Sequence, residues 1–239
     1  MAVYVGPRFI QIPPNQISGL LAWYSPGEQG AVISASTLTN LANNLVEGTV
    51  TSPAVVQLGD DNIKELSFGA TGRVAFGDRY KPTTGVTLIT IMKNTDLTRA
   101  TQFHGGMGNT GDDGYFLSKI NPDTVVFRAG VGNGFANPTS SAGQHISNQW
   151  QMFTGTYDGT TMKIYRGSEL KTNGGNPYTG DISYVGVTQG YWATVQGQTG
   201  DVNRYWIGSG RVYIVYNRPL TNDEISGIYY HYKNLGYVP

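Results

Sequence analysis

Acidic side chains and histidines are the residues of this sequence best suited to chemistry, and their spacing argues against an enzyme. Hydrolysis of a glycosidic bond needs two carboxylates about 5–10 Å apart, flanking the bond. The five glutamates are widely scattered, at Glu28, Glu47, Glu65, Glu169 and Glu224. Glu224 is better explained as a helix cap, so no hydrolase site is predicted.

The three histidines, His104, His145 and His231, lie far apart in the sequence. None has the i,i+4 spacing of a metal-binding helix, and no nucleophile with a base stands out. We expect solvated or capping histidines. The absence of cysteine excludes a disulfide scaffold and a thiolate zinc site. The chain is therefore predicted not to be an enzyme.

The stretch from Trp150 to Gly167 is expected to organise the fold. Asp158-Gly159 is a strong hairpin signal and predicts a type I′ turn, which needs positive φ at both central residues. The pairs expected on the mostly apolar face are Phe153–Ile164, Gly155–Met162 and Tyr157–Thr160. Such a face indicates an antiparallel pair packed on a core.

The remaining elements follow from periodicity and turn residues. We predict a central strand over 85–93, loops over 34–52 and 104–114, and neighbouring strands over 115–120 and 124–128. A further strand is expected over 211–217. Thr221 and Glu224 form a capping-box pattern before a closing helix, which Gly236 can stop. Many short strands and one terminal helix indicate an all-β, two-sheet antiparallel sandwich.

Three stretches resemble one family. Trp-x-x-Phe-x-Gly-Thr-Tyr-Asp-Gly from Trp150 is similar to the central hairpin of laminin-G-like domains, which belong to the concanavalin A-like lectin/glucanase superfamily. Residues 18–24 resemble its first strand, and residues 205–225 its last strand and closing helix. The resemblance implies a jelly-roll domain over 18–239 and core positions for Trp23, Trp150 and Trp206. The Glu-x-Asp-x-x-Glu strand of the superfamily's glucanases is absent.

Residues 1–17 precede this domain as an apolar, proline-containing extended arm. Its apolar side chains are Val3, Val5, Phe9, Ile10 and Ile12. They must be buried, either as an extra strand of the same sandwich or by docking onto a neighbouring subunit. The two alternatives stay open at this point.

Some laminin-G-like domains hold Ca²⁺ at one rim, and the resemblance therefore suggests a calcium site here. Ca²⁺ takes six to eight oxygen ligands from flexible loops. Asp112 and Asp113 in a glycine-rich loop and Asp201 are the candidates. Aspartate before glycine is also an ordinary turn, so calcium is kept as an option and no other cofactor is predicted.

A sugar site in such a fold needs an exposed aromatic platform with polar partners. Tyr191-Trp192, flanked by Thr, Gln and Gly, is the best candidate, with Tyr178 and Tyr184 near in sequence. An exposed Tyr-Trp pair is equally typical of a protein interface, which we slightly prefer.

Composition excludes several classes of partner. Lysine plus arginine equals aspartate plus glutamate, at 16 each, and no basic run is present, so no nucleic-acid binding is predicted. The first residues do not form a secretory signal, and no apolar run is long enough to span a membrane.

These features favour a non-enzymatic structural protein of a virus particle, such as a bacteriophage capsid-decoration or tail protein. Its expected location is the virion, and its expected partners are other virion proteins and further copies of itself. The alternative is a glycan-binding module that recognises a cell-surface or other polysaccharide.

Overall fold

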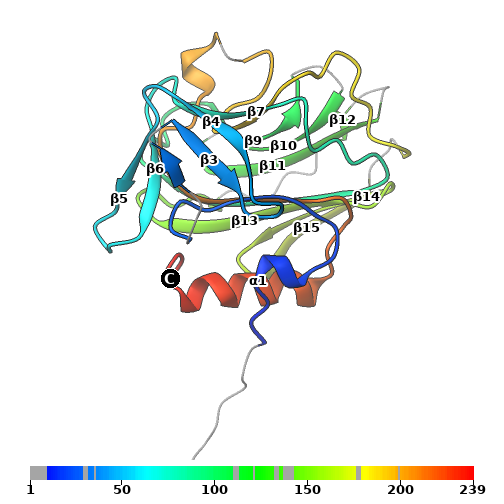
Figure 1. Cartoon of the computed structure of the whole chain (residues 1–239). Helices are drawn as coiled ribbons and strands as arrows, with labels where there is room; N and C mark the ends of the chain where they lie inside the picture. The colour runs from blue at the N-terminus through cyan, green and yellow to red at the C-terminus, as the bar shows by residue number, and fades with distance from the viewer. Residues whose placement is uncertain are drawn as a thin grey trace, which may run out of the picture.

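The protein is a two-sheet sandwich with one helix beneath it (Figure 1). This computed structural model describes residues 10–28, 32–34, 36–109, 113–120, 122–131, 135–136, 143–175, 179–198 and 200–239. All strand pairs in this part are antiparallel, which confirms the prediction of an all-β jelly-roll sandwich with a terminal helix.

The sheet that the helix covers, here the helix-side sheet, has eight strands. Their order is β15 (Glu169–Gly175), β14 (Thr161–Arg166), β13 (Trp150–Tyr157), β8 (Val86–Asn94), β17 (Gly208–Tyr216), β6 (Lys64–Phe68) and β5 (Val55–Leu58), with β1 (Leu20–Tyr24) also pairing with β17. The predicted central strand is confirmed, because β8 lies between β13 and β17.

The second sheet, here the opposite sheet, has nine strands. Their order is β12 (Phe135–Ala136), β11 (Thr124–Val131), β10 (Asp113–Ile120), β9 (Thr101–Gly108), β16 (Gly190–Trp192), β7 (Arg73–Gly77), β4 (Leu45–Thr51), β3 (Thr37–Asn40) and β2 (Val32–Ser34). The neighbouring strands β10 and β11 were predicted. The prediction of a loop over 34–52 is wrong, because β2, β3 and β4 occupy most of this segment.

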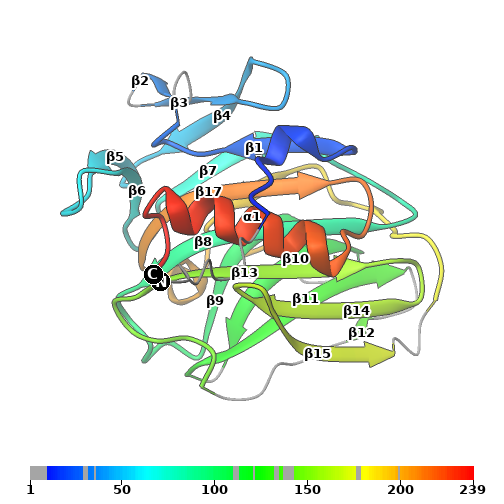
Figure 2. The same ribbon diagram turned by 90° about the horizontal axis from the view of Figure 1, so that it is seen from below.

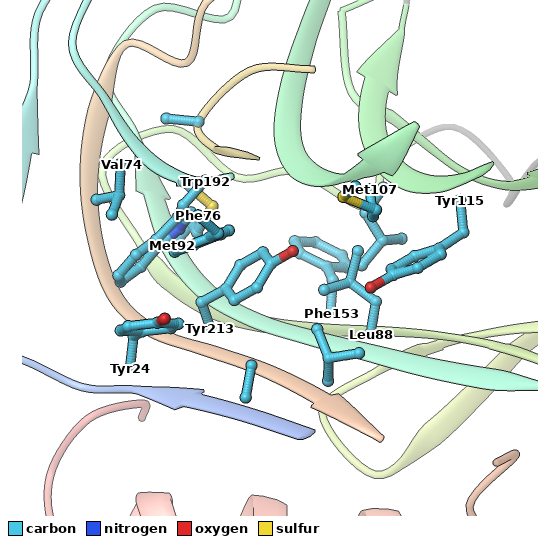
Figure 3. Close-up of a cluster of buried hydrophobic side chains, with 14 of the residues drawn as sticks. Tyr24, Val74, Phe76, Leu88, Met92, Met107, Tyr115, Phe153, Trp192 and Tyr213 are labelled. Atoms are coloured by element: carbon cyan, nitrogen blue, oxygen red, sulfur yellow. The ribbon is translucent and has the colours of Figure 1, made fainter. Parts of the chain in front are cut away.

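The main core fills the space between the two sheets (Figure 3). Leu88, Met92 and Phe153 from the helix-side sheet meet Phe76, Met107 and Tyr115 from the opposite sheet. Aromatic rings stack here, with the centroids of Tyr24 and Phe76 4.7 Å apart. Burial of such large rings supplies much of the stability of an all-β fold without disulfides.

A second core lies between the helix-side sheet and α1 (Asn222–Asn234), which crosses β17, β8 and β13 (Figure 2). Ile225, Ile228 and Tyr232 of the helix are buried against sheet residues that include Ile89 and Met152. The predicted capping box is confirmed, since Thr221 and Glu224 cap each other's backbone N–H groups. No helix among the described residues is long and apolar enough to cross a membrane.

The β13–β14 hairpin has the predicted faces but a different register. The observed pairs are Phe153–Arg166, Gly155–Ile164 and Tyr157–Met162. Gly159 (φ +91°) and Thr160 form the tip, and only the first has positive φ, as in a type II′ turn. Asp158 lies before the tip, where its carboxylate accepts N–H bonds from Thr160 and Thr161. The observed pairing of β13 with β14 is shifted by two residues from the predicted pairing. Because side chains alternate with a period of two, each one stays on its predicted face of the sheet.

The glycine-rich stretch predicted as a loop over 104–114 is mostly strand. β9 continues through Gly108, and β10 begins at Asp113. At Gly105 an added Cβ would lie 2.4 Å from the carbonyl oxygen of Tyr191, and at Gly114 2.0 Å from that of Met107. These glycines permit close approach of backbones inside a sheet, which the sequence does not distinguish from a flexible loop.

The described part of the arm packs on its own chain. Ile12 donates its N–H to the carbonyl of Gly227 at 3.1 Å, and its side chain lies where a Cβ of Gly227 would be. Pro14 and Ile17 are buried, whereas Ile10 is 77% exposed. For Ile12, docking onto a neighbour is therefore wrong. Val3, Val5 and Phe9 lie outside the described residues, and the boundary at residue 17 stays a prediction.

Removal of residues 1–17 is expected to lower the free energy of unfolding by about 3–5 kcal/mol. The physical reason is the exposure of the second core where Ile12 and Ile17 now cover it. Urea unfolding would measure the loss, with a chain lacking residues 1–11 as the matched control. Equal stability of the two truncated chains would show that residues 12–17 do not support the fold.

Candidate functional site

The aromatic platform predicted at Tyr191-Trp192 is wrong, because both side chains are buried. Trp192 is 0% exposed and packs in the core beside Phe76 and Tyr213 (Figure 3), and Tyr191 is 8% exposed. Tyr184 is half-buried and donates its hydroxyl to the carbonyl of Pro82 at 2.7 Å. The remaining candidate, Tyr178, lies outside the described residues. Strand β16 buries the pair by inserting between β7 and β9.

The calcium candidates that the structure describes already have other partners. Asp113 accepts a hydrogen bond from the hydroxyl of Ser183. Asp201 caps a short 3₁₀ helix, η2 (Val202–Arg204), and pairs with Arg204 at 3.0 Å. Among the described residues no three His, Cys, Asp or Glu side chains could hold a metal together. These two residues do not fit a calcium site, and Asp112 lies outside the described residues.

Two of the three histidines form a buried pair, contrary to the expectation of solvated or capping side chains. The Nε2 atoms of His104 and His145 are 3.1 Å apart, and His104 Nδ1 lies 2.9 Å from the hydroxyl of Thr90. Both rings contact Phe153 and Trp206. Burial lowers the pKa of His104 to about 3 and lowers that of His145 well below its usual value.

Trp150 is the tryptophan that is least buried. Trp192 and Trp206 are fully buried and Trp23 is 9% exposed, whereas Trp150 is half-buried. It begins β13, two residues before Met152, and therefore lies on the same face as the side chains under α1. Its position beside the end of the helix leaves part of the ring uncovered. Trp150 thus packs against the second core as expected, but it is only partly buried.

A row of side chains runs from Trp150 across the helix-side sheet. Trp150 pairs with Lys93, Lys93 with Ser209, and Ser209 with Ser67. Adjacent strands are about 4.8 Å apart, so the row spans roughly 14 Å. Glu65, two residues before Ser67, shares this face. We call this row, with Glu65, the Trp150 strip.

Three hollows adjoin the Trp150 strip. One of about 160 Å³ lies between Trp150 and Tyr229. A second, of about 630 Å³, lies between Trp150 and residues 236–239. A third, of about 230 Å³, is lined by Glu65, Lys93 and Ser209. Their polar side chains include those of Gln57, Asp60, Ser67, Thr95, Asn148, Gln149, Gln151, Arg166, Glu169 and Lys171.

Arg211 fixes the orientation of the Trp150 ring. A β-bulge between Gly210 and Val212 leaves Arg211 opposite no residue of β8. Its guanidinium carbon lies 3.9 Å from the centroid of Trp150, and it also donates to both carboxylate oxygens of Asp61. Burial opposes ionisation of Asp61, but hydrogen bonds and the charge of Arg211 outweigh it and lower the pKa of that carboxyl. The buried cation is thus paired, and the ring is held beneath it.

Glu65 is the acidic group of the Trp150 strip, and one of its oxygens accepts hydrogen bonds from neighbouring side chains. Glu65 is 2% exposed, and its Oε1 accepts from Ser209 at 2.8 Å and from Gln57 at 3.1 Å. Its Oε2 has no hydrogen-bond partner and lies 3.7 Å from Arg211. This carboxylate is therefore enclosed beside Arg211 and offsets part of the charge of the buried guanidinium.

Another large hollow, of about 700 Å³, is lined by β4 and β7 and suits a ligand less well. Its aromatic side chain, Phe76, is buried in the main core. Its carboxylate, Glu47, already accepts from Arg79 at 2.7 Å, Tyr80 at 2.6 Å and Asn40 at 2.8 Å. We therefore place the candidate site at the Trp150 strip.

The architecture and the strip together define a lectin-like β-sandwich. A family model described as concanavalin A-like lectin/glucanases superfamily matches residues 68–226, so the chain belongs to this superfamily. The resemblance in the hairpin and last strand is thereby confirmed. No curated protein matches the sequence.

Several solved structures share the fold at low identity. Domain 4 of AbnA, an extracellular arabinanase from Geobacillus stearothermophilus, in complex with arabinotriose, has 14% identity and a TM-score of 0.65. The match covers 87% of this chain and 97% of that domain. The binding domain of Paraclostridial Mosquitocidal Protein 1 gives 11% identity, a TM-score of 0.67 and coverage of 90% and 53%.

The receptor binding domain of botulinum neurotoxin D is a further similar structure, with 14% identity and a TM-score of 0.60. The match covers 89% of this chain and 52% of that one, so the chain spans about half the length of the toxin domains. At such identities the likeness establishes the fold alone.

Proposed function

We propose that this chain is a glycan-binding module that holds an oligosaccharide along the Trp150 strip. The observation that carries the proposal is the partly buried Trp150 ring, which Arg211 contacts and which hollows border. A rigid aromatic face stacks on the apolar face of a sugar ring, and surrounding polar groups hydrogen-bond its hydroxyls. The length of the strip suits a short chain of sugars.

The similar structures support the same class of function. One was solved with arabinotriose, and the others are binding domains of toxins. A non-catalytic role is proposed because the described glutamates of the strip and of the β4–β7 hollow have structural partners. No observation favours the virion protein over the glycan-binding module, and the virion location stays a prediction.

Replacement of Trp150 by alanine is expected to abolish glycan binding on a microarray of oligosaccharides that includes arabinotriose. Loss of one stacked aromatic ring removes at least about tenfold in affinity. Tyr230→Ala, at a half-buried aromatic position on α1, is the matched control and should bind as the unchanged chain does.

Ser67→Tyr provides a second test that leaves Trp150 in place. The larger side chain would obstruct the strip at its β6 end, and calorimetry should show weaker binding of the ligands found on the microarray. Far-ultraviolet circular dichroism would verify that each variant is folded. If glycan binding is unchanged in both Trp150→Ala and Ser67→Tyr, the strip is not the binding site. If the unchanged chain binds no glycan at all, the proposed function is wrong.

A further inference from the structure

Strand β5 is an unprotected edge of the helix-side sheet. Among the described strands it pairs with β6 alone, and no labelled element lies beyond it (Figures 1 and 2). Its sequence, Val-Val-Gln-Leu, contains no charge and no proline, and its register with β6 has no bulge. Val55 is 50% exposed and Leu58 is 60% exposed. An edge strand with these properties is open to pairing with another chain.

The other edges in the described part of the sheets are less suited to such pairing. β15, at the far end of the same sheet, carries Glu169 and Lys171. In the opposite sheet, β12 has two residues, and β2 pairs irregularly with β3. The outer side of β1 is occupied, because the backbone of Trp23 hydrogen-bonds with Asn40 and Leu41. Charges, short length and irregular register each discourage strand addition, so β5 is the edge that best fits a partner.

The pairing of β5 with β6 determines which backbone groups remain available. Gly59 donates its N–H to the carbonyl of Ile63 at 2.9 Å, in the same register as the strand pairs. Hydrogen-bonded and non-hydrogen-bonded pairs alternate along an antiparallel ladder. The backbone N–H and C=O groups of Gln57 therefore point to β6, whereas those of Val56 and Leu58 point outward.

We propose that a second copy of this chain binds this edge, with the two β5 strands antiparallel about a two-fold axis at Gln57. Val56 then lies opposite Leu58 of the second copy, and this pair exchanges both of its backbone hydrogen bonds. The two-fold axis forms each contact twice. The side chain of Val56 packs partly against the main core, and the exposed side chain of Leu58 from the second copy would cover it.

The distribution of charge permits two copies to meet here. The formal net charge of the chain is zero, so the copies do not repel each other as a whole. Asp60, two residues after β5, is exposed, but in this register the two Asp60 residues would lie roughly 20 Å apart. Asp61 is paired with Arg211 of its own chain. The pairing therefore brings together no like charges of these aspartates.

The same pairing would join two copies of the Trp150 strip. Ser67, at the end of the strip, pairs with Val55, and the hollow lined by Lys93 and Ser209 extends to Gly59. In the proposed register Val55 of the second copy lies beside Gly59, at the border of that hollow. Each copy would thus contribute a side chain next to the other's strip, with both strips on one face of the joined sheet.

A cysteine placed on the two-fold axis tests the register directly, because the chain has no cysteine of its own. Gln57 and its copy form a non-hydrogen-bonded pair with Cα atoms about 4.5 Å apart, which a disulfide can bridge. Gln57→Cys should therefore give a covalent dimer on mild oxidation, visible by non-reducing electrophoresis. Val55→Cys is the matched control, because its two copies would lie roughly 14 Å apart and should not cross-link.

Sedimentation velocity measures the assembly without a cross-link. The unchanged chain should show a monomer–dimer equilibrium. Leu58→Lys should raise the dissociation constant of the dimer at least about tenfold, because it removes the apolar cover of Val56 and places a charge at the border. Leu170→Lys makes the same change at a 40% exposed position of β15 and should leave the equilibrium unchanged. Far-ultraviolet circular dichroism would verify that both variants are folded.

A chain that remains a monomer up to its highest soluble concentration would overturn the proposal. A dimer that Leu58→Lys leaves intact would overturn it as well, since another surface would then hold the copies together. Failure of Gln57→Cys to cross-link, or equal cross-linking of Val55→Cys, would reject the pairing about Gln57. None of these outcomes depends on glycan binding, which the microarray tests separately.

Discussion

Replacement of Gly105 by alanine is expected to lower the free energy of unfolding by about 3–5 kcal/mol. Gly105 has φ +141°, and an added Cβ would lie 2.4 Å from the carbonyl oxygen of Tyr191 and 2.9 Å from the Cα of Trp192. Both atoms belong to the backbone of β16, which is held between β7 and β9 and cannot move aside. A loss of this size is a large share of the ~5–15 kcal/mol that stabilises a typical domain.

Gly180→Ala is the matched control for this prediction. Gly180 has a similar φ of +129°, but an added Cβ there would meet no atom within 4 Å. Urea unfolding should therefore show about 1–2 kcal/mol of loss from backbone strain alone. If the two variants lose the same free energy, the close approach of β9 and β16 is not what requires glycine at position 105.

The His104–His145 pair is expected to make the fold sensitive to acid. Burial is the largest cause that lowers both pKa values, and the positive charges of Lys119 and Arg166 add to it. The folded chain therefore binds fewer protons than the unfolded chain at mildly acidic pH. The stabilisation is complete above the ordinary histidine pKa of ~6.5 and is lost as the pH falls below it, towards about 3 for His104.

Urea unfolding between pH 7.5 and pH 4.5 measures this effect. Each histidine should contribute about 1.4 kcal/mol per pH unit below its unfolded pKa, so the slope for the pair is roughly 2.7 kcal/mol per pH unit. His145→Gln should reduce the slope by about half, since one titrating group of the pair is removed. His231→Gln, at a half-buried position on α1, is the control and should change the slope much less. An unchanged slope in His145→Gln would contradict the prediction.

Local patterns in the sequence determined several elements that the structure confirms. Thr221 and Glu224 cap α1 through contacts three residues apart, which need no information from the rest of the chain. The alternation of β13 and β14 likewise assigned Phe153 and Ile164 to the core face. The register was wrong because Asp158 uses its side chain to set the turn one residue later.

Only the tertiary structure decided which aromatic side chains are accessible. Tyr191-Trp192 lies in a polar, turn-rich stretch and was predicted to be exposed, yet pairing of β16 with β7 and β9 buries it. Trp150 lies in an apolar strand and was predicted to be buried, yet it begins β13 and borders a hollow with residues 236–239, which follow α1. The alternation of Trp150 with Met152 could have indicated on which face of the sheet Trp150 lies. The sequence does not show how much of that face α1 covers.

The candidate site, too, is formed only by the tertiary structure. Trp150, Lys93, Ser209 and Ser67 come from four strands, with more than 50 positions separating most of them in the sequence, and each looks ordinary in its own segment. The bulge at Arg211 depends on how β17 pairs with β8. Sequence alone determined the closing helix and the strands with clear alternation, because these depend on neighbouring residues, whereas β2 to β4 and most of β9 had been predicted as loops. The strip and the buried histidine pair arose only when sheet pairing brought distant residues together, because long-range pairing, not local preference, decides which side chains meet.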